Sequence, residues 1–500
     1  MKKTKVRTSK ILLWVVSAAL VAILSVSLAF MGVALNRTKN LYKTDFSDLT
    51  GLASKTVLFI GDGMGVNQVN GTETYLAALE GRIGVVPLCF TQFPAVGCVT
   101  TFSGTNGVTD SAAAGTALSS GKKTHNGTLG MLADLKTNVS SVAEWAKAAG
   151  AAVGVSTTVS VDHATPAAFY AHVPDRGMYY EIGRQMIAAG YDFYAGSDFL
   201  EPVGPDSAQA GTLYEQCART GYTVVRGYPE FQRKAAGAGR VVLFQTEEAS
   251  RRDRTAVPYA IDRTADDLTL QDIARAGISQ LTAAGKDGFF FMLEGGKVDW
   301  ACHSNDAATA FREVVDLDNA VRVAYEFYRQ HPDETLIVIT ADHETGGIAL
   351  GRGPYELHTE LLGCQKMSAE AYTVHLKELQ RTSGDGFTWD VVRQDLQENW
   401  GFWDRVQLTD KQAARLKAAF DRLSGGQAAT VKGHYASLSD LANTARDVMA
   451  EAALIGWQSG EHSNGYVPVY AIGAGAEKFA AKLDNTQIPL RIAEAAGWKH

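Results

Sequence analysis

Short, nearly continuous apolar runs alternate with helical patterns from residue 55 to the end of the chain. Strands are predicted at 56–61, 151–157, 241–245, 288–295, 335–341 and 466–473. Helices are predicted at 111–119, 140–149, 178–189, 266–284, 306–329, 411–423 and 436–456. Strands that are apolar throughout and separated by helices are typical of a mostly parallel sheet with both faces covered. The pattern therefore predicts an α/β fold, a three-layer sandwich with a central mostly parallel sheet flanked by helices.

Residues 350–460 depart from this alternation. They are helical in pattern, polar, and richer in Gln, Lys and Asp than the segments around them. We interpret them as a helical insertion between the 335–341 strand and the last strand, within one large domain that covers 51–500.

The first 50 residues have a different character. Residues 1–10 carry five positive charges and no negative one, and the 25 residues of 11–35 carry no charge. A helix of that length spans roughly 37 Å, enough to cross a bilayer. We predict a basic cytoplasmic tail at 1–10, an uncleaved transmembrane signal anchor at 11–35 and a polar linker at 36–50, with the body extracytoplasmic at the cell surface. The alternative is a cleaved signal peptide, which would make the protein secreted.

Composition and charge narrow the class of protein. The 500 residues are 46% hydrophobic and 20% charged, which excludes disordered and collagen-like chains. The net charge is −7 although the N-terminus is basic, so the body is acidic and no nucleic acid is expected as a specific partner. The five cysteines are scattered without a CxxC pair, which argues against a cysteine zinc ribbon. Cys89 and Cys98 are the one close pair and the candidate for a disulfide in an oxidising compartment.

Acids and histidines gather at or after the ends of predicted strands. They are Asp62, Glu294, Asp299, His303, Asp342, His343 and His462. In a parallel sheet the carboxyl ends of the strands meet at one edge, where ligands bind. Carboxylate and imidazole ligands without cysteine are typical of catalytic zinc, which keeps one coordination position open. The pattern therefore indicates a metal site at this edge.

Ser111 opens a predicted helix of small residues directly after Asp110, a plausible N-cap. A hydroxyl there meets free backbone N–H groups and the positive end of the helix dipole. That environment suits a nucleophile that carries a phosphoryl group, although an ordinary capped helix would have the same local sequence.

Six motifs resemble the alkaline phosphatase family. They are FIGDGMG (59–65), VTDSAAAGTA (108–117), HATPAAFYAHVPDR (163–176), EGGKVDWACH (294–303), TADHETGG (340–347) and GEHSNG (460–465), and they occur in the family's order. The resemblance runs from about residue 55 to residue 476. It implies hydrolysis of phosphate monoesters to an alcohol and inorganic phosphate through a phosphoserine intermediate, with two zinc ions and one magnesium ion as cofactors.

The resemblance also implies a role for each matched residue. Ser111 would be the nucleophile, and Arg176 would grip two phosphate oxygens. The first zinc would be held by Asp299, His303 and His462. The second would be held by Asp62, Asp342, His343 and the Ser111 oxygen, and the magnesium by Asp62, Thr165 and Glu294.

Two positions depart from better-known members of the family. His163 and Trp300 stand where the best-known enterobacterial enzyme has Asp and Lys, and where the animal enzymes have His at both. We assign both residues to substrate binding. Because Trp300 brings no charge and His163 replaces a carboxylate, we expect a looser grip on phosphate and weaker magnesium binding.

Other functions fit the sequence less well. The alternative within the superfamily is a phosphodiesterase, but Ser111 and Glu294 favour a monoesterase. A sulfatase motif is absent, and no metal ligand is lost as a non-catalytic binding protein would allow. The expected partners are small-molecule phosphate monoesters and the membrane through residues 11–35. Homodimers are common in the family, and no feature of the sequence decides between a monomer and a homodimer.

Overall fold

The computed structural model describes residues 51–235, 238–426 and 430–500, which belong to one compact unit, Leu49–His500. Across these ranges no helix has both the length and the apolar character needed to span a membrane. The anchor predicted at 11–35, with its flanking tail and linker, lies outside the described residues.

A ten-stranded sheet forms the centre of this unit, in the order β16-β2-β15-β8-β1-β7-β3-β4-β6-β5. Its strands are β1 (Lys55–Gly61), β2 (Ala95–Thr100), β3 (Ala152–Thr157), β4 (Phe193–Gly196), β5 (Tyr222–Arg226), β6 (Arg240–Phe244), β7 (Phe289–Gly295), β8 (Thr335–Thr340), β15 (Val467–Gly473) and β16 (Lys482–Asp484). Only β15 runs antiparallel to its neighbours within this sheet. The predicted mostly parallel sheet is therefore confirmed.

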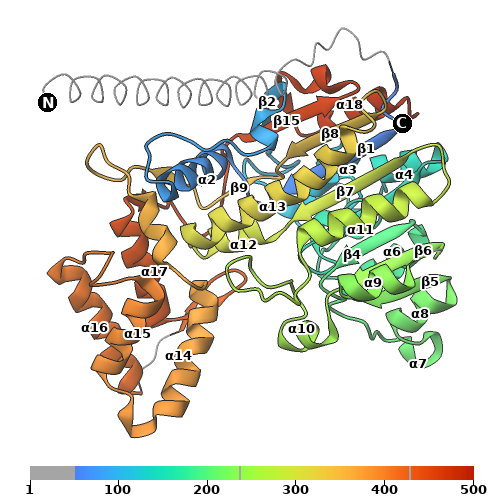
Figure 1. Cartoon of the computed structure of the whole chain (residues 1–500). Coiled ribbons are helices and arrows are strands. Elements are labelled where there is room, and N and C mark those ends of the chain that lie inside the picture. The colour runs from blue at the N-terminus through green and yellow to red at the C-terminus, as the bar shows by residue number, and fades with distance from the viewer. Residues whose placement is uncertain (1–50, 236–237, 427–429) are drawn as a thin grey trace, which may run out of the picture. The chain divides into compact units, whose positions relative to one another are not determined.

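Helices cover the sheet on both faces. On one face α11 (Leu270–Ala283) and α13 (Ala307–Tyr328) pack together over β7, with α12 (Lys297–His303) beside α13 (Figure 1). On the other, α3 (Ser111–Ser120), α4 (Val142–Ala148), α5 (Ala164–Ala167) and α18 (Gln487–Ala496) contact one another and the central strands. The other α-helices outside the predicted insertion are α2 (Val66–Leu79), α6 (Tyr179–Ala189), α7 (Ser207–Ala210), α8 (Leu213–Arg219), α9 (Tyr228–Lys234) and α10 (Glu247–Arg252).

The six predicted strands are all present, and the structure adds four strands to this sheet that the pattern did not reveal. Of these, β16, β2 and β5 lie at or next to the sheet's edges, and β4 lies between β3 and β6; β4 has four residues and β16 three. Such short or half-exposed strands give little apolar signal, because only a strand buried on both faces reads as a continuous hydrophobic run. The cysteines are all free, so Cys89 and Cys98 do not form the disulfide considered from their spacing.

The region predicted as an insertion is mainly helical. It contains α14 (Ala369–Ser383), α15 (Trp389–Trp400), α16 (Asp410–Ser424) and α17 (Asp440–Ala452), which cluster together in orange in Figure 1. Their amphipathic faces bury a hydrophobic core that includes Tyr372, Leu396, Trp400, Leu416 and Val448. A short hairpin, β11 (Thr430–Lys432) paired with β12 (Ser437–Ser439), precedes α17.

Candidate functional site

Ser111 is the first residue of α3 and is completely buried. Asp110 caps the helix, since its Oδ1 accepts a hydrogen bond of 3.0 Å from the backbone N–H of Ala113. The Ser111 hydroxyl thus sits at the positive end of the helix dipole, with its Oγ 3.3 Å from Nε2 of His343.

Three acids reach Ser111's side of the sheet from neighbouring strands. Asp62 follows β1, Glu294 lies near the end of β7, and Asp342 follows β8. The parallel register places Ile60 beside Glu294 and also beside Thr340. The three strands therefore end at the same height in the sheet, and their acids lie close together. The predicted clustering of strand-end carboxylates is therefore what the topology produces.

Another set of ligand atoms comes from α12 and from β14 (His462–Ser463). Oδ2 of Asp299 lies 3.3 Å from Nε2 of His303, which lies 3.1 Å from Nε2 of His462. β14 pairs with β9 (Glu344–Thr345), directly after His343, and this pairing holds His462 against the end of β8.

These side chains form three overlapping groups that fit metal ions. The groups are Asp299 with His343 and His462, Asp62 with Asp342 and His343, and Asp62 with His163 and Glu294; within each, the ligand atoms lie within 4.8 Å of one another. Buried oxygens of Asp62, Glu294, Asp299 and Asp342 have no hydrogen-bond partner. Unsatisfied buried carboxylates are costly, and divalent cations would satisfy them.

The pKa values of the four acids also favour bound cations. Burial, and then repulsion from neighbouring carboxylates, raises the pKa of Asp62 well above its usual value and that of Asp342 to about 8. Burial raises the pKa of Glu294 to about 7. Asp299 is the exception: despite its burial, the imidazole of His303 holds its pKa below the usual range. So many buried acids repel one another unless positive charge is placed between them.

Arg176 reaches the same place from the loop after α5. Its Nη1 donates to Oδ2 of Asp110 at 3.1 Å, and its Nη2 lies 3.4 Å from Nε2 of His163. Burial, followed by the charge of Arg176, lowers the pKa of His163 to about 3, so this imidazole is neutral at physiological pH. Arg176, His163 and His462 line a cavity of about 590 Å³ that opens beside Ser111's helix.

A family model described as alkaline phosphatase matches residues 53–195 and 253–498, most of the chain. The chain belongs to the alkaline phosphatase family. It is 30% identical to alkaline phosphatase 3 of Bacillus subtilis over 444 residues, which covers 88% of each protein. Two solved structures are similar, each with a TM-score of 0.72. The cold-active enzyme from a psychrophilic Shewanella is 26% identical, over 88% of this chain and 99% of its own, and the Thermus thermophilus enzyme is 28% identical, over 90% and 93%.

In this phosphatase the motif residues lie together, but three details differ from the expected assignment. The group that contains Asp299 and His462 includes His343, whereas the resemblance assigns His303 to that metal. The group around Glu294 includes His163, which the resemblance assigns to substrate binding, while Thr165 is buried nearby at the start of α5. Trp300 does not line the 590 Å³ cavity, because the ring of Tyr435 stacks on it at 4.5 Å with an interplanar angle of 10°.

The sequence did not identify several residues that contact the candidate site. Thr345 donates a hydrogen bond of 2.5 Å to Oδ1 of Asp299, and Gln68 donates one of 2.6 Å to Glu344, at the turn that positions His343. Both Thr345 and Glu344 lie within TADHETGG, so the motif was a signal for them. For Tyr435, which lies in the insertion, no local signal existed.

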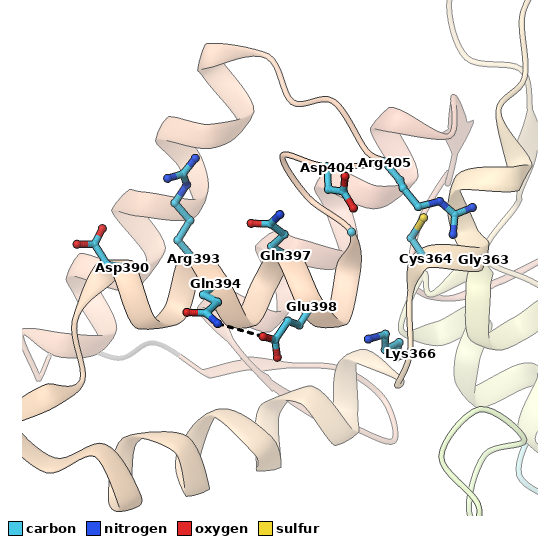
Figure 2. Close-up of a pocket in the computed structure, with 11 residues that line it drawn as sticks. Gly363, Cys364, Lys366, Asp390, Arg393, Gln394, Gln397, Glu398, Asp404 and Arg405 are labelled. Carbon is cyan, nitrogen blue, oxygen red and sulfur yellow. Dashed lines mark hydrogen bonds between the residues drawn. The ribbon is translucent and has the colours of Figure 1, made fainter.

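A cavity of about 780 Å³ lies in the insertion, away from all of these residues. Its wall mixes basic side chains such as Arg393 and Lys366 with acidic ones such as Asp390 and Glu398, which come from α15 and the segment before α14 (Figure 2). Its charged wall residues are balanced, with Lys366, Arg393 and Arg405 against Asp390, Glu398 and Asp404.

Proposed function

We propose that this phosphatase hydrolyses phosphate monoesters through a phosphoserine formed at Ser111, using two zinc ions and one magnesium ion. The observation that carries the proposal is the position of the Ser111 hydroxyl. It lies 3.3 Å from His343, a residue shared by two of the three ligand groups.

The donor set suits the proposed ions. Asp299, His303 and His462 would hold one zinc, Asp62, Asp342 and His343 the other, and Glu294 with Asp62 and Thr165 the magnesium, with His163 close by. When bound, such ions stabilise the charge that develops on the entering and leaving oxygens and make water acidic enough to form hydroxide near neutral pH.

The chain's own groups account for the remaining steps. Arg176, oriented by Asp110, presents two parallel N–H groups that match two phosphate oxygens. Ser111 Oγ bonds to phosphorus as the ester P–O bond breaks and the alcohol leaves. Water then attacks the same phosphorus, which releases inorganic phosphate and restores Ser111. The N-terminus of α3 stabilises the negative charge near Oγ throughout.

The test combines metal analysis of the purified protein with hydrolysis of a monoester and the matched diester. We expect at least two zinc ions per active chain, turnover of the monoester, and a phosphorylated Ser111 peptide after acid quenching. Faster turnover of the diester would favour the phosphodiesterase alternative, and an active chain without bound metal would reject the metal assignment.

We also propose that residues 11–35 anchor the enzyme with its body outside the cell. The support is the charge pattern of the N-terminus. Protease treatment of intact cells should release the domain that begins near residue 50. A mature N-terminus found close to Phe30 would instead identify a cleaved signal peptide, and sedimentation of the released domain would test for the expected homodimer.

A further inference from the structure

The β11–β12 hairpin carries the insertion onto the site. At its tip, His434 stacks on His303 with ring centres 4.8 Å apart, and Tyr435 stacks on Trp300 at 4.5 Å. The Tyr435 ring also approaches those of His303 and His163, at 5.3 and 6.0 Å. Two successive residues of the insertion therefore contact both the proposed zinc ligands and the proposed substrate pocket.

Tyr435 packs on a buried aromatic side chain that is itself supported by a cation. Trp300 beneath it is 6% exposed, and Nζ of Lys297 lies 4.7 Å from the centre of the Trp300 ring. The same Nζ lies 3.6 Å from the ring centre of Tyr259. A cation held between two aromatic rings attracts both, so Tyr259, Lys297 and Trp300 form a fixed support for Tyr435.

Tyr435 lines the 590 Å³ cavity where Trp300 does not. Beside Arg176 and His163, the cavity wall carries the flat or apolar side chains of Val108, Tyr179, His434 and Tyr435 and the polar side chains of Asn126, Asp175 and Glu461. With the phosphate end of a substrate held at Arg176 and Ser111, the alcohol portion would extend into this cavity, where the ring of Tyr435 lies 6.0 Å from that of His163.

We propose that Tyr435 is a specificity-determining residue that contacts the leaving group and favours monoesters of flat, aromatic or heterocyclic alcohols. This inference rests on the proposed function, because it takes Ser111 and Arg176 as the phosphate end of the site. A well-placed pair of aromatic rings strengthens binding by roughly two- to tenfold.

The test uses the full chain loaded with zinc and magnesium, and two phosphonates that the enzyme cannot hydrolyse. Benzylphosphonate carries a flat ring and ethylphosphonate does not, and calorimetry gives the Kd of each. We expect the wild type and Tyr435→Phe to bind benzylphosphonate roughly two- to tenfold more tightly than ethylphosphonate. Tyr435→Ala, and Tyr435→Leu as a variant of closer volume, should lose this preference.

Lys432→Ala is the matched control, because Lys432 is exposed on the same hairpin and should keep the wild-type preference. The proposal is overturned if the wild type shows no preference, or if folded Tyr435→Ala and Tyr435→Leu both retain it. Binding is measured without turnover, so the two proposals can fail separately. If the chain hydrolyses no monoester but its preference for benzylphosphonate still depends on Tyr435, the proposed function is rejected and the role of Tyr435 in ligand selection stands.

Discussion

At the scale of single residues, the proposed chemistry depends on Ser111. It is buried at the start of a capped helix, and no other hydroxyl of α3 lies against a candidate metal ligand in the interactions that the described residues show. Ser111→Ala should lower monoester turnover by at least about 10³-fold, because the atom that bonds to phosphorus is removed. Steady-state kinetics and metal analysis of the folded variant measure this.

Ser120→Ala provides the control for that variant. Ser120 is buried in the same helix, but its hydroxyl donates only to the backbone oxygen of Thr116. It should keep turnover near that of the wild type. A Ser111→Ala enzyme with bound metals and unchanged turnover would contradict the nucleophile assignment.

His163 tests the third ligand group. It lies with Asp62 and Glu294, and an imidazole, unlike a carboxylate, brings no negative charge to attract magnesium. Oxygen ligands suit magnesium better than imidazole does. His163→Asp should therefore reduce the magnesium concentration needed for half-maximal reactivation of metal-stripped enzyme. An unchanged magnesium requirement would place His163 outside the third site.

At the scale of elements, the turn after β1 lies against residues of both proposed zinc groups, because the backbone N–H of Gly63 donates to Oδ1 of Asp342 at 3.2 Å and Gly63 also packs against Asp299. Gly63 has φ +72°, and a Cβ added there would lie 2.8 Å from Cα of Asp299. Gly81 has φ +71° with no atom within 4 Å of such a Cβ. Gly81→Ala should cost about 1–2 kcal/mol of stability through backbone strain alone. Gly63→Ala should cost more and also lower the zinc content, measured by denaturation and elemental analysis; equal effects of the two variants would contradict this.

An ion pair joins α4 to the segment that carries Arg176. Nε2 of His172 lies 3.4 Å from Oε1 of Glu144, and this bond raises the pKa of His172, while that of Glu144 is lowered despite its burial. A raised histidine pKa contributes stability that is fully present below about pH 6.5 and is lost as pH rises through the folded value.

His172→Gln should accordingly lower the Tm more at pH 5.5 than at pH 9. At pH 5.5 Glu144 is still ionised and His172 is charged, whereas at pH 9 the imidazole is neutral and only its hydrogen bonds are lost. The loss in the free energy of unfolding should be about 0.5–1 kcal/mol larger at pH 5.5 than at pH 9, the usual size for an ion pair near the surface. Equal losses at both pH values would show that the ion pair contributes nothing.

At the scale of the whole molecule, the buried acids couple metal binding to stability. The carboxylates at the carboxyl ends of the central strands repel one another; they belong to Asp62, Asp342 and Glu294. Removal of divalent cations should therefore lower the Tm as well as abolish turnover. A metal ion present at a free concentration of about 100 times its Kd stabilises the folded state by about 2.7 kcal/mol. Calorimetry before and after chelation measures the effect, and zinc with magnesium should restore both properties. Full activity and an unchanged Tm after chelation would contradict the metal sites.

The amino-acid sequence by itself determined the type of sheet, six of its ten strands and the set of residues gathered at or after their ends. It could do so because buried parallel strands read as continuous apolar runs, and because the ligands lie in short motifs at strand ends. The proximity of Ser111, His343 and Asp62 follows from that topology.

Only the tertiary structure decided which residues form the wall of the pocket. Tyr435 lies in the insertion, far along the chain from Trp300 and His163, and nothing in its local sequence distinguishes it from other loop residues. The edge strand β16 and its neighbour β2 were missed for a related reason, since their pairing depends on partners distant in the sequence. Contacts of this kind arise from packing between separate elements, which local periodicity and short motifs do not encode.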